Sequence, residues 1–449
     1  MTPARRILAS TFPLVVVALV APACSGGSSW KTPTVVRIES KEPVASMMPS
    51  WINWLSDSPE GQPQALLLRD GDLIFGPDAP FRYQASDGTS LKIEAEKWMV
   101  RVGQKIVTIG FNEQEGRDWL AKATDSQLKD LRLVGIPKDI SADVHDLLGR
   151  LASANPSVDL MLESEAGLLE TLPKFAPRSV FMPDDAKAAS VGLLANEPQL
   201  ETLLIKSDEA GGLDVLAKIP KLTRLVVGDW DPAKTGPLPT GMNSHLRSLI
   251  VAGGSAVKDL AGLKNVPTDL EELSVIDTKN LTDITGVSRF PHLTTLILNG
   301  SEGIGDLSGL SALKDLRWVG VPEKTTQEQF AAFVSAHADL AVLDLIGNKQ
   351  ITSLAPLASL THLEGLILQG PYENMSAIHA LKTLKFVGLS DKVWDASPEQ
   401  VAALKAALPD AMVVRVSPFC LGSGWILLLA PALLIVWAVR RRTVRPAAA

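Results

Sequence analysis

The stretch 293–319, LTTLILNGSEGIGDLSGLSALKDLRWV, decides the fold. It opens with Leu293-x-x-Leu296-x-Leu298, whose alternating apolar residues predict a short strand with one buried face. A second apolar series at a spacing of three follows, at Ile304, Leu307, Leu310 and Leu313. That spacing is typical of turns or a 3₁₀ segment with one apolar edge. The stretch therefore predicts one strand, one return segment and, from Leu316, the next strand.

The strand pattern recurs along the chain. Accepting isoleucine or valine in place of leucine, Leu-x-x-Leu-x-Leu has nine successive matches at steps of 21 to 24 residues. Their first leucines are Leu200, Leu222, Leu246, Leu270, Leu293, Leu316, Leu340, Leu363 and Leu384. Neither half of such a unit can bury its apolar edge alone, so successive units must stack and share a core. The regular step predicts a solenoid.

This repeat resembles the short, bacterial, internalin-like leucine-rich repeat over roughly residues 198–416. The resemblance implies an α/β leucine-rich repeat solenoid with a parallel β-sheet on its concave face, and a role in adhesion or partner recognition. One departure is the asparagine that the family carries three residues after the strand's last leucine. Only Asn348 occupies that place here. We therefore expect irregular turns rather than a different fold.

Two return segments predict regular helices. Thr326 with Gln329, and Ser397 with Gln400, have the spacing of a capping box, and Pro398 suits a first helical position.

Upstream of the array, the pattern weakens. We interpret residues 116–197 as degenerate repeats or a cap, on the basis of Leu128-x-x-Leu131-x-Leu133 and similar runs. Residues 51–115 contain short alternating strands with turn signals at Asp70-Gly71 and Asp87-Gly88. They predict a small β domain of about five strands.

The N-terminus predicts export. Residues 1–23 have a basic start, a largely apolar run too short to span a bilayer, and small residues before Cys24. The sequence around Cys24 resembles the end of a bacterial lipoprotein signal, which makes Cys24 a candidate for lipidation; ordinary cleavage beside an inert cysteine is the alternative. Residues 24–50 are rich in proline, serine and glycine and predict a tether.

The C-terminus predicts a membrane anchor. Residues 419–439 are uncharged and long enough to cross a hydrocarbon core as a helix. The basic tail 440–449 follows, so the positive-inside rule places the C-terminus in the cytoplasm and the body outside it, in the periplasm or at the cell surface. The alternative is a sorting tail that is cut and exchanged for a surface anchor.

Charge and composition exclude several functions. The chain has 43 basic and 50 acidic residues; without six arginines near its two ends, 37 basic residues remain against 50 acidic ones, a net charge of −13. Phosphate backbones repel such a body, so we expect no nucleic-acid partner. Cys24 and Cys420 lie at the two ends. We find no catalytic, cofactor or metal motif, and expect neither an enzyme nor a bound cofactor.

The remaining candidate site is the concave face, onto which the third and fifth residues of each repeat should point. Large aliphatic residues dominate the fifth position, and aromatic and charged residues stand among the third. The candidate partner-binding residues are Leu204, Arg224, Val226, Ile250, Glu272, Ile297, Trp318, Val342, Ile367 and Phe386. Such a stripe is typical of a protein-binding face. Alternatively, β propensity alone selects these residues, or a neighbouring segment covers them.

These features together predict a membrane-anchored protein that recognises a protein or peptide partner at the cell envelope through its concave face. The alternative is a non-catalytic structural spacer that presents the N-terminal β domain.

Overall fold

The computed structural model describes residues 65–416 apart from short gaps at 69–70, 77–78, 85–89, 96–98, 103, 112–113, 132, 184–185, 207–212, 229, 243, 253–255, 277, 299 and 385. The predicted signal peptide, tether, membrane segment and basic tail lie outside these described residues, as does Cys24. Within the described part of the chain, no helix is both long and apolar enough to cross a membrane.

The nine repeat matches form successive strands of one parallel sheet, and this prediction is confirmed. The strands are β10 (Thr202–Lys206), β11 (Arg224–Gly228), β12 (Ser248–Ala252), β13 (Glu272–Ile276), β14 (Thr295–Ile297), β15 (Trp318–Gly320), β16 (Val342–Asp344), β17 (Gly365–Leu368) and β18 (Phe386–Ser390). Their register aligns the fourth residue of every repeat, from Leu203 through Leu296 to Val387. All nine side chains in this row are fully buried in one continuous core.

A repeated backbone arrangement joins neighbouring repeats. The carbonyl of Glu201 accepts hydrogen bonds from the amides of Thr223 and Arg224, and the carbonyl of Thr223 does the same for the next repeat. The series continues to Ala341, whose carbonyl accepts from Glu364 and Gly365. Each repeat thus satisfies backbone groups of its neighbour as well as sharing its core.

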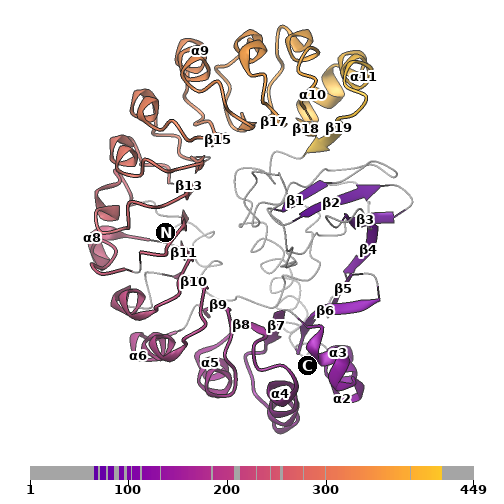
Figure 1. The fold of residues 1–449 in the computed structure, drawn as a ribbon, viewed down its shortest axis with the longest axis vertical. Helices are drawn as coiled ribbons and strands as arrows, with labels where there is room; N and C mark the ends of the chain where they lie inside the picture. Colours follow the sequence, from indigo (N-terminus) through magenta and orange to yellow (C-terminus); the bar gives the residue numbers. More distant parts are fainter. Residues whose placement is uncertain are drawn as a thin grey trace, which may run out of the picture.

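The return segments run along the outer side of the arc (Figure 1). Most are 3₁₀ helices, as the spacing of three predicts: η2 (Gly192–Asn196), η3 (Leu213–Lys218), η4 (Ala261–Leu263), η5 (Thr285–Arg289), η6 (Ser308–Ala312), η7 (Ala355–Ser359) and η8 (Met375–Ile378). A short helix, α8 (Pro232–Thr235), lies between β11 and β12.

Regular helices replace the 3₁₀ segment in two repeats, where the sequence predicts them. In α9 (Gln327–Ala336) the Thr326 hydroxyl accepts from the Gln329 amide and the Gln329 side chain accepts from the Thr326 amide, which completes the predicted capping box. The last return comprises α10 (Asp391–Ala396) and α11 (Pro398–Ala407), with Pro398 at the first position of α11. Ser397 makes no side-chain cap there, so its part of the capping-box prediction is wrong. Strand β19 (Met412–Val416) follows and pairs with β18.

The parallel array also extends upstream of the nine matches. It includes β7 (Leu133–Ile136), β8 (Asp159–Leu162) and β9 (Ser179–Phe181). Helix α4 (Ala142–Ala154) lies between β7 and β8, α5 (Glu165–Thr171) with η1 (Leu172–Lys174) lies between β8 and β9, and α6 (Ala188–Val191) lies between β9 and β10. Before β7 come α2 (Gln114–Lys122) and α3 (Asp125–Lys129).

The phase predicted for β7 is wrong. The motif Leu128-x-x-Leu131-x-Leu133 would put Leu133 in the solenoid core. The register pairs Val134 with Leu160 instead, and Leu133 lies in a separate small cluster with Met161 and Phe181. All four residues of this strand, LVGI, are non-polar, so neither face is marked by polar residues. The pattern alone therefore does not tell which face points into the core.

Among the described residues before the helix α2 there are six strands: β1 (Ala65–Leu68), β2 (Gly71–Gly76), β3 (Ala79–Gln84), β4 (Ser90–Ala95), β5 (Met99–Val102) and β6 (Lys105–Gly110). They pair in antiparallel order, each with the next. Because β6 pairs in parallel with β7, the sheet continues from this region into the solenoid.

Different side chains occupy the place of the family's asparagine. Asn348 is buried; its amide donates to the carbonyls of Pro322 (2.8 Å) and Thr325 (2.9 Å), and its oxygen accepts from the amides of Gln350 and Ile351 (both 2.9 Å). Two other repeats use hydroxyls. Ser301 donates to the Val275 carbonyl and contacts the Thr278 hydroxyl at 2.6 Å, and both side chains are fully buried.

Replacing Asn348 by alanine should therefore destabilise the fold by about 2–4 kcal/mol, because it leaves two carbonyls and two amides of a buried turn without partners. The matched control is Asn374→Ala, which removes one bond to the Leu354 amide and one to the Ser353 hydroxyl from a half-buried residue and should cost about 1 kcal/mol. Urea unfolding of the two variants measures the difference. Equal losses would contradict a special role for Asn348.

Candidate partner-binding face

The register gathers the predicted fifth-position residues into one row. Successive strands align Leu204, Val226, Ile250, Ser274, Ile297, Gly320, Asp344, Ile367 and Gly388. The third-position residues form a parallel row that contains Arg224, Ser248, Glu272, Thr295, Trp318, Val342, Gly365 and Phe386. Because alternate residues of a strand point to opposite faces, both rows lie on the face away from the leucine core. We call them together the concave rows.

The concave rows are buried, yet their apolar residues lie outside the core of the solenoid. The large aliphatic residues of the fifth-position row, such as Ile250 at 2% and Val226 at 8%, are buried, and so are Trp318, Val342 and Glu272. None of the concave-row apolar residues from Leu204 to Ile367 belongs to the continuous core cluster. Arg224 is half-buried. The rows are thus a second apolar surface that is covered, which agrees with cover by a neighbouring segment, one of the alternatives above.

The row also extends further toward the N-terminus than the repeat pattern indicates. Phe181 on β9 aligns with Leu204, and Met161 on β8 aligns with Phe181. Leu133 and Met161 are buried and pack with Phe181 in their own cluster. These residues were missed because β8 and β9 have Ser157 and Pro177 in place of the leading leucine, and because the motif was read one step out of phase at β7.

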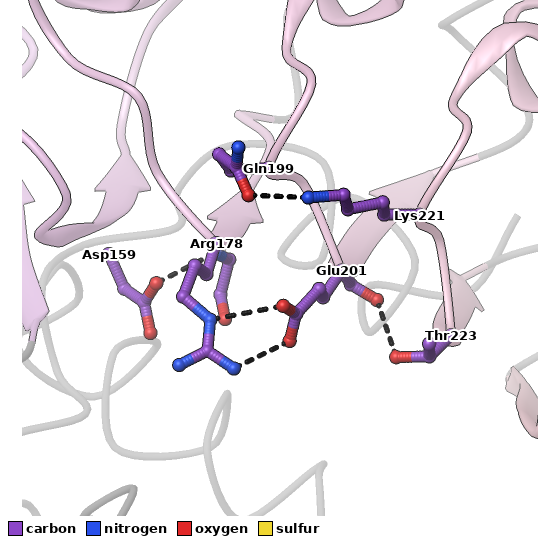
Figure 2. Close-up of polar contacts among 7 residues, drawn as sticks. Asp159, Arg178, Gln199, Glu201, Lys221 and Thr223 are labelled. Atoms are coloured by element: carbon purple, nitrogen blue, oxygen red, sulfur yellow. Dashed lines mark hydrogen bonds and ion pairs between the residues drawn. The ribbon is translucent and has the colours of Figure 1, made fainter.

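A polar rim lies beside the rows at the amino ends of β9 to β11 (Figure 2). Arg178 forms a two-point ion pair with Glu201, with nitrogen–oxygen distances of 3.2 and 2.8 Å. The Thr223 hydroxyl donates to the Glu201 carbonyl, and Lys221 donates to Gln199 at 2.8 Å. Further along the same edge, Arg247 pairs with Glu271 and Arg317 with Asp339. These pairs, most of them between half-buried side chains, link adjacent repeats, and each adds little stability because water still reaches it.

The carboxyl ends of β14 to β16 hold an unusual acid, Glu323. Its side chain is partly buried and packs directly against Gly347, so closely that a Cβ at position 347 would collide with it. Gly347 has a φ of +82°, which favours glycine. Burial raises the pKa of Glu323, and the neighbouring carboxylate of Glu302 raises it further, whereas Lys349 and Lys279 oppose the shift.

Buried polar groups also lie at the fifth-position row on β16. The Asp344 carboxylate accepts from the Ile346 amide at 2.8 Å. Nearby, burial raises the pKa of Tyr372 to about 12, and its hydroxyl accepts from the amides of Gln369 and Gly370.

Three histidines, His245, His292 and His362, each precede the first leucine of a repeat and are exposed. His292 lies 3.6 Å from the Asp315 carboxylate. No group of three potential metal ligands occurs in the part of the chain that the structure describes.

The described residues define the class of fold: a parallel-sheet α/β solenoid that resembles leucine-rich repeat proteins. No protein-family model and no curated protein matches the chain. Among solved structures, an internalin from Listeria monocytogenes is 18% identical over 67% of this chain and 86% of its own, with a TM-score of 0.33. A TLR13–ssRNA13 complex is 16% identical over 64% of this chain and 42% of that chain, with a TM-score of 0.37. The Toll–Spatzle complex of Drosophila is 12% identical over 79% and 58%, also at 0.37.

Replacing Glu323 by glutamine should stabilise the protein at pH 7. The folded-state pKa of Glu323 lies above its unfolded value, so ionisation costs stability at pH values above the folded pKa, and the cost disappears as the pH falls through it. The gain in free energy of unfolding should therefore shrink from pH 7 toward pH 4.

Urea unfolding of wild type and Glu323→Gln across this range measures the gain. Glu302→Gln is the control, because it removes only the neighbouring charge and should give a smaller gain with the same sign. A gain that does not change with pH would show that ionisation of Glu323 is not its cause.

Proposed function

We propose that this protein is a membrane-anchored recognition protein of the cell envelope whose concave rows bind a protein or peptide partner. The observation that supports this best is a second apolar surface, aligned strand by strand and separate from the core that holds the solenoid together. A solenoid needs only one apolar face to stack. A second one fits a surface that is buried against something else.

The chemistry of the concave rows suits an extended polypeptide. Val226 and Ile250 lie side by side on neighbouring strands, and Ile297 follows one strand further on, after Ser274. Arg224 and Glu272 supply charges of opposite sign in the adjacent row, which would orient a partner. Trp318 supplies a large aromatic side chain of the kind that dominates binding energies.

The proposed anchor is separated from the solenoid by a short linker. Strand β19 ends at Val416, and the apolar segment 419–439 begins after a linker of two residues, Ser417 and Pro418. If that segment spans the membrane, the last repeat is held close to the bilayer. Eight strand steps of about 4.8 Å would then put the first of the nine repeats roughly 40 Å away.

A second candidate function is the structural spacer. The low exposure of the concave rows favours it, because a surface that is covered within the chain need not meet a partner. Under this alternative, the solenoid holds β1 to β6 away from the membrane.

A variant with Ile250→Asp, Ile297→Asp and Trp318→Ala should lose at least tenfold in the yield of a specific partner captured from envelope extract. Buried charges in the concave rows would oppose an apolar partner surface. The measurement is affinity capture with the detergent-solubilised full chain, followed by mass spectrometry.

The matched control is Ala312→Asp with Ala358→Asp, which adds the same two charges at exposed positions of η6 and η7. Both variants must remain folded at the temperature of the capture, as measured by circular dichroism. Equal capture by wild type and both variants would contradict recognition by the concave rows and leave the spacer.

Deleting residues 417–449 should move the protein from the membrane pellet to the soluble fraction after carbonate extraction, provided that Cys24 is also replaced by serine. Each single variant tests the anchor that remains. A lipid on Cys24 would hold the deletion variant in the pellet, and a membrane-spanning C-terminal segment would hold the Cys24→Ser variant there. A double variant that stays in the pellet would contradict anchoring by these two ends.

A further inference from the structure

A histidine occupies an otherwise apolar place in several repeats. Three residues before a repeat's first leucine, buried apolar side chains fill the core, as at Phe290, Leu313, Leu360 and Leu381. His337 takes the same place before Leu340 and is only 5% exposed. An apolar side chain satisfies the packing at this place in the neighbouring repeats, so packing alone does not explain a histidine there.

Both ring nitrogens of His337 face backbone carbonyl oxygens. Nδ1 lies 2.9 Å from the carbonyl oxygen of Phe333, one turn back in α9, and Nε2 lies 3.0 Å from that of Leu310, on η6 of the preceding repeat. A carbonyl oxygen can only accept a hydrogen bond, and a neutral imidazole has a single N–H. The neutral ring therefore satisfies one of the two contacts and opposes lone pairs at the other. The protonated ring donates to both.

The end of α9 favours the positive charge. His337 is the C-cap of this helix, and Phe333 carries one of its last four carbonyls, where a cation interacts favourably with the helix dipole. The Phe333 ring, whose centroid lies 4.5 Å from that of the imidazole, also attracts a cation. Burial opposes the charge, but each N–H of the protonated ring has a carbonyl in place of water, and hydrogen bonds from a charged donor are the stronger kind.

Another repeat makes the equivalent contact with a permanent cation. The carbonyls of Leu263 in η4 and Leu310 in η6 hold equivalent places, each accepting from the amide three residues further on. The Arg289 guanidinium, from the next repeat, donates to the Leu263 carbonyl and, at 3.2 Å, to that of Val266. This carbonyl thus faces a donor from the next repeat in both places, and the donor is always charged in one place and titratable in the other.

The surroundings of the ring hold no competing buried charge among the segments packed against it. The return segments in contact with α9 are η6 and η7, whose sequences SGLSA and APLAS contain no charged residue. The core residues of the adjacent strands, Val319 and Leu343, are apolar. The titratable or charged residues nearest along these segments are all exposed to water: Glu328, Asp339, Lys314, Asp315 and His362. The two carbonyls therefore decide which form of the ring the folded chain favours.

We propose that His337 is a pH-sensitive clamp between two repeats, whose protonated ring joins the end of α9 to η6 through a second hydrogen bond. Because the folded chain holds the protonated ring better than the neutral one, the added stability is present at low pH and is lost as the pH rises. Each repeat contacts only its neighbours, so the effect is centred on these two repeats. The clamp does not depend on the proposed binding of a partner.

The test is native-state hydrogen exchange followed by mass spectrometry on the detergent-solubilised full chain at pH 5.5 and pH 8. Wild type is compared with His337→Gln and His337→Leu at the same pH, so that the intrinsic pH dependence of amide exchange cancels in the ratio of rates. Glutamine keeps a hydrogen-bond donor, leucine restores the residue usual at this place, and neither titrates. If one of them does not fold, the other still carries the test. The matched control is His362→Gln, which removes an exposed histidine one repeat further on.

The proposal predicts that exchange of residues 327–340, relative to wild type, is faster in the His337 variants by a factor that is about fivefold larger at pH 5.5 than at pH 8. The ratio for His362→Gln should be the same at both pH values. A ratio for the His337 variants that does not change with pH would overturn the proposal, since the ring would then not switch. A ratio that is smaller at pH 5.5 would also overturn it, by showing that the cost of burying the charge outweighs the second hydrogen bond.

Discussion

The structure depends on one constraint: no repeat can bury its own apolar edge or satisfy its own strand. The Leu296 row is fully buried only because β13 and β15 supply the neighbouring residues of the same row. The backbone repeats the same dependence, because the carbonyl of Glu271 takes its two hydrogen bonds from the amides of Thr294 and Thr295 in the next repeat. Interactions are therefore between nearest neighbours, and stability accumulates along the stack.

The same constraint explains why most repeats fold without the family's asparagine after the strand. Each turn requires a hydrogen-bond donor for its inward-facing carbonyls, and a hydroxyl can supply one. Ser301 does so toward Val275, whereas Asn348 satisfies four backbone groups at once. The turns vary while the strand register stays fixed, because the register is set by the core leucines and not by the turn.

The sequence predicted those parts of the fold that depend on strict local periodicity. Leucine spacing placed β10 to β18, and the spacing of three placed the 3₁₀ returns. Prediction from the sequence failed at β7, where both faces of the strand are apolar and Leu133 was assigned to the wrong face. The sequence also placed Ile250 and Ile297 on one row. Their burial was one of two alternatives left open, because a repeat pattern shows which residues share a face of the sheet and not what packs on that face.

The central claim is that residues from β9 to β18 form one continuous stack with a shared core. Native-state hydrogen exchange followed by mass spectrometry tests it directly, since strand amides such as those of Ser248, Glu272 and Thr295 bond across repeat boundaries. We predict that the strand amides of β9 to β18 exchange slowly, as a single protected block. A rapidly exchanging strand in the middle of the array, such as β12 or β13, with protected blocks on either side, would contradict a continuous stack.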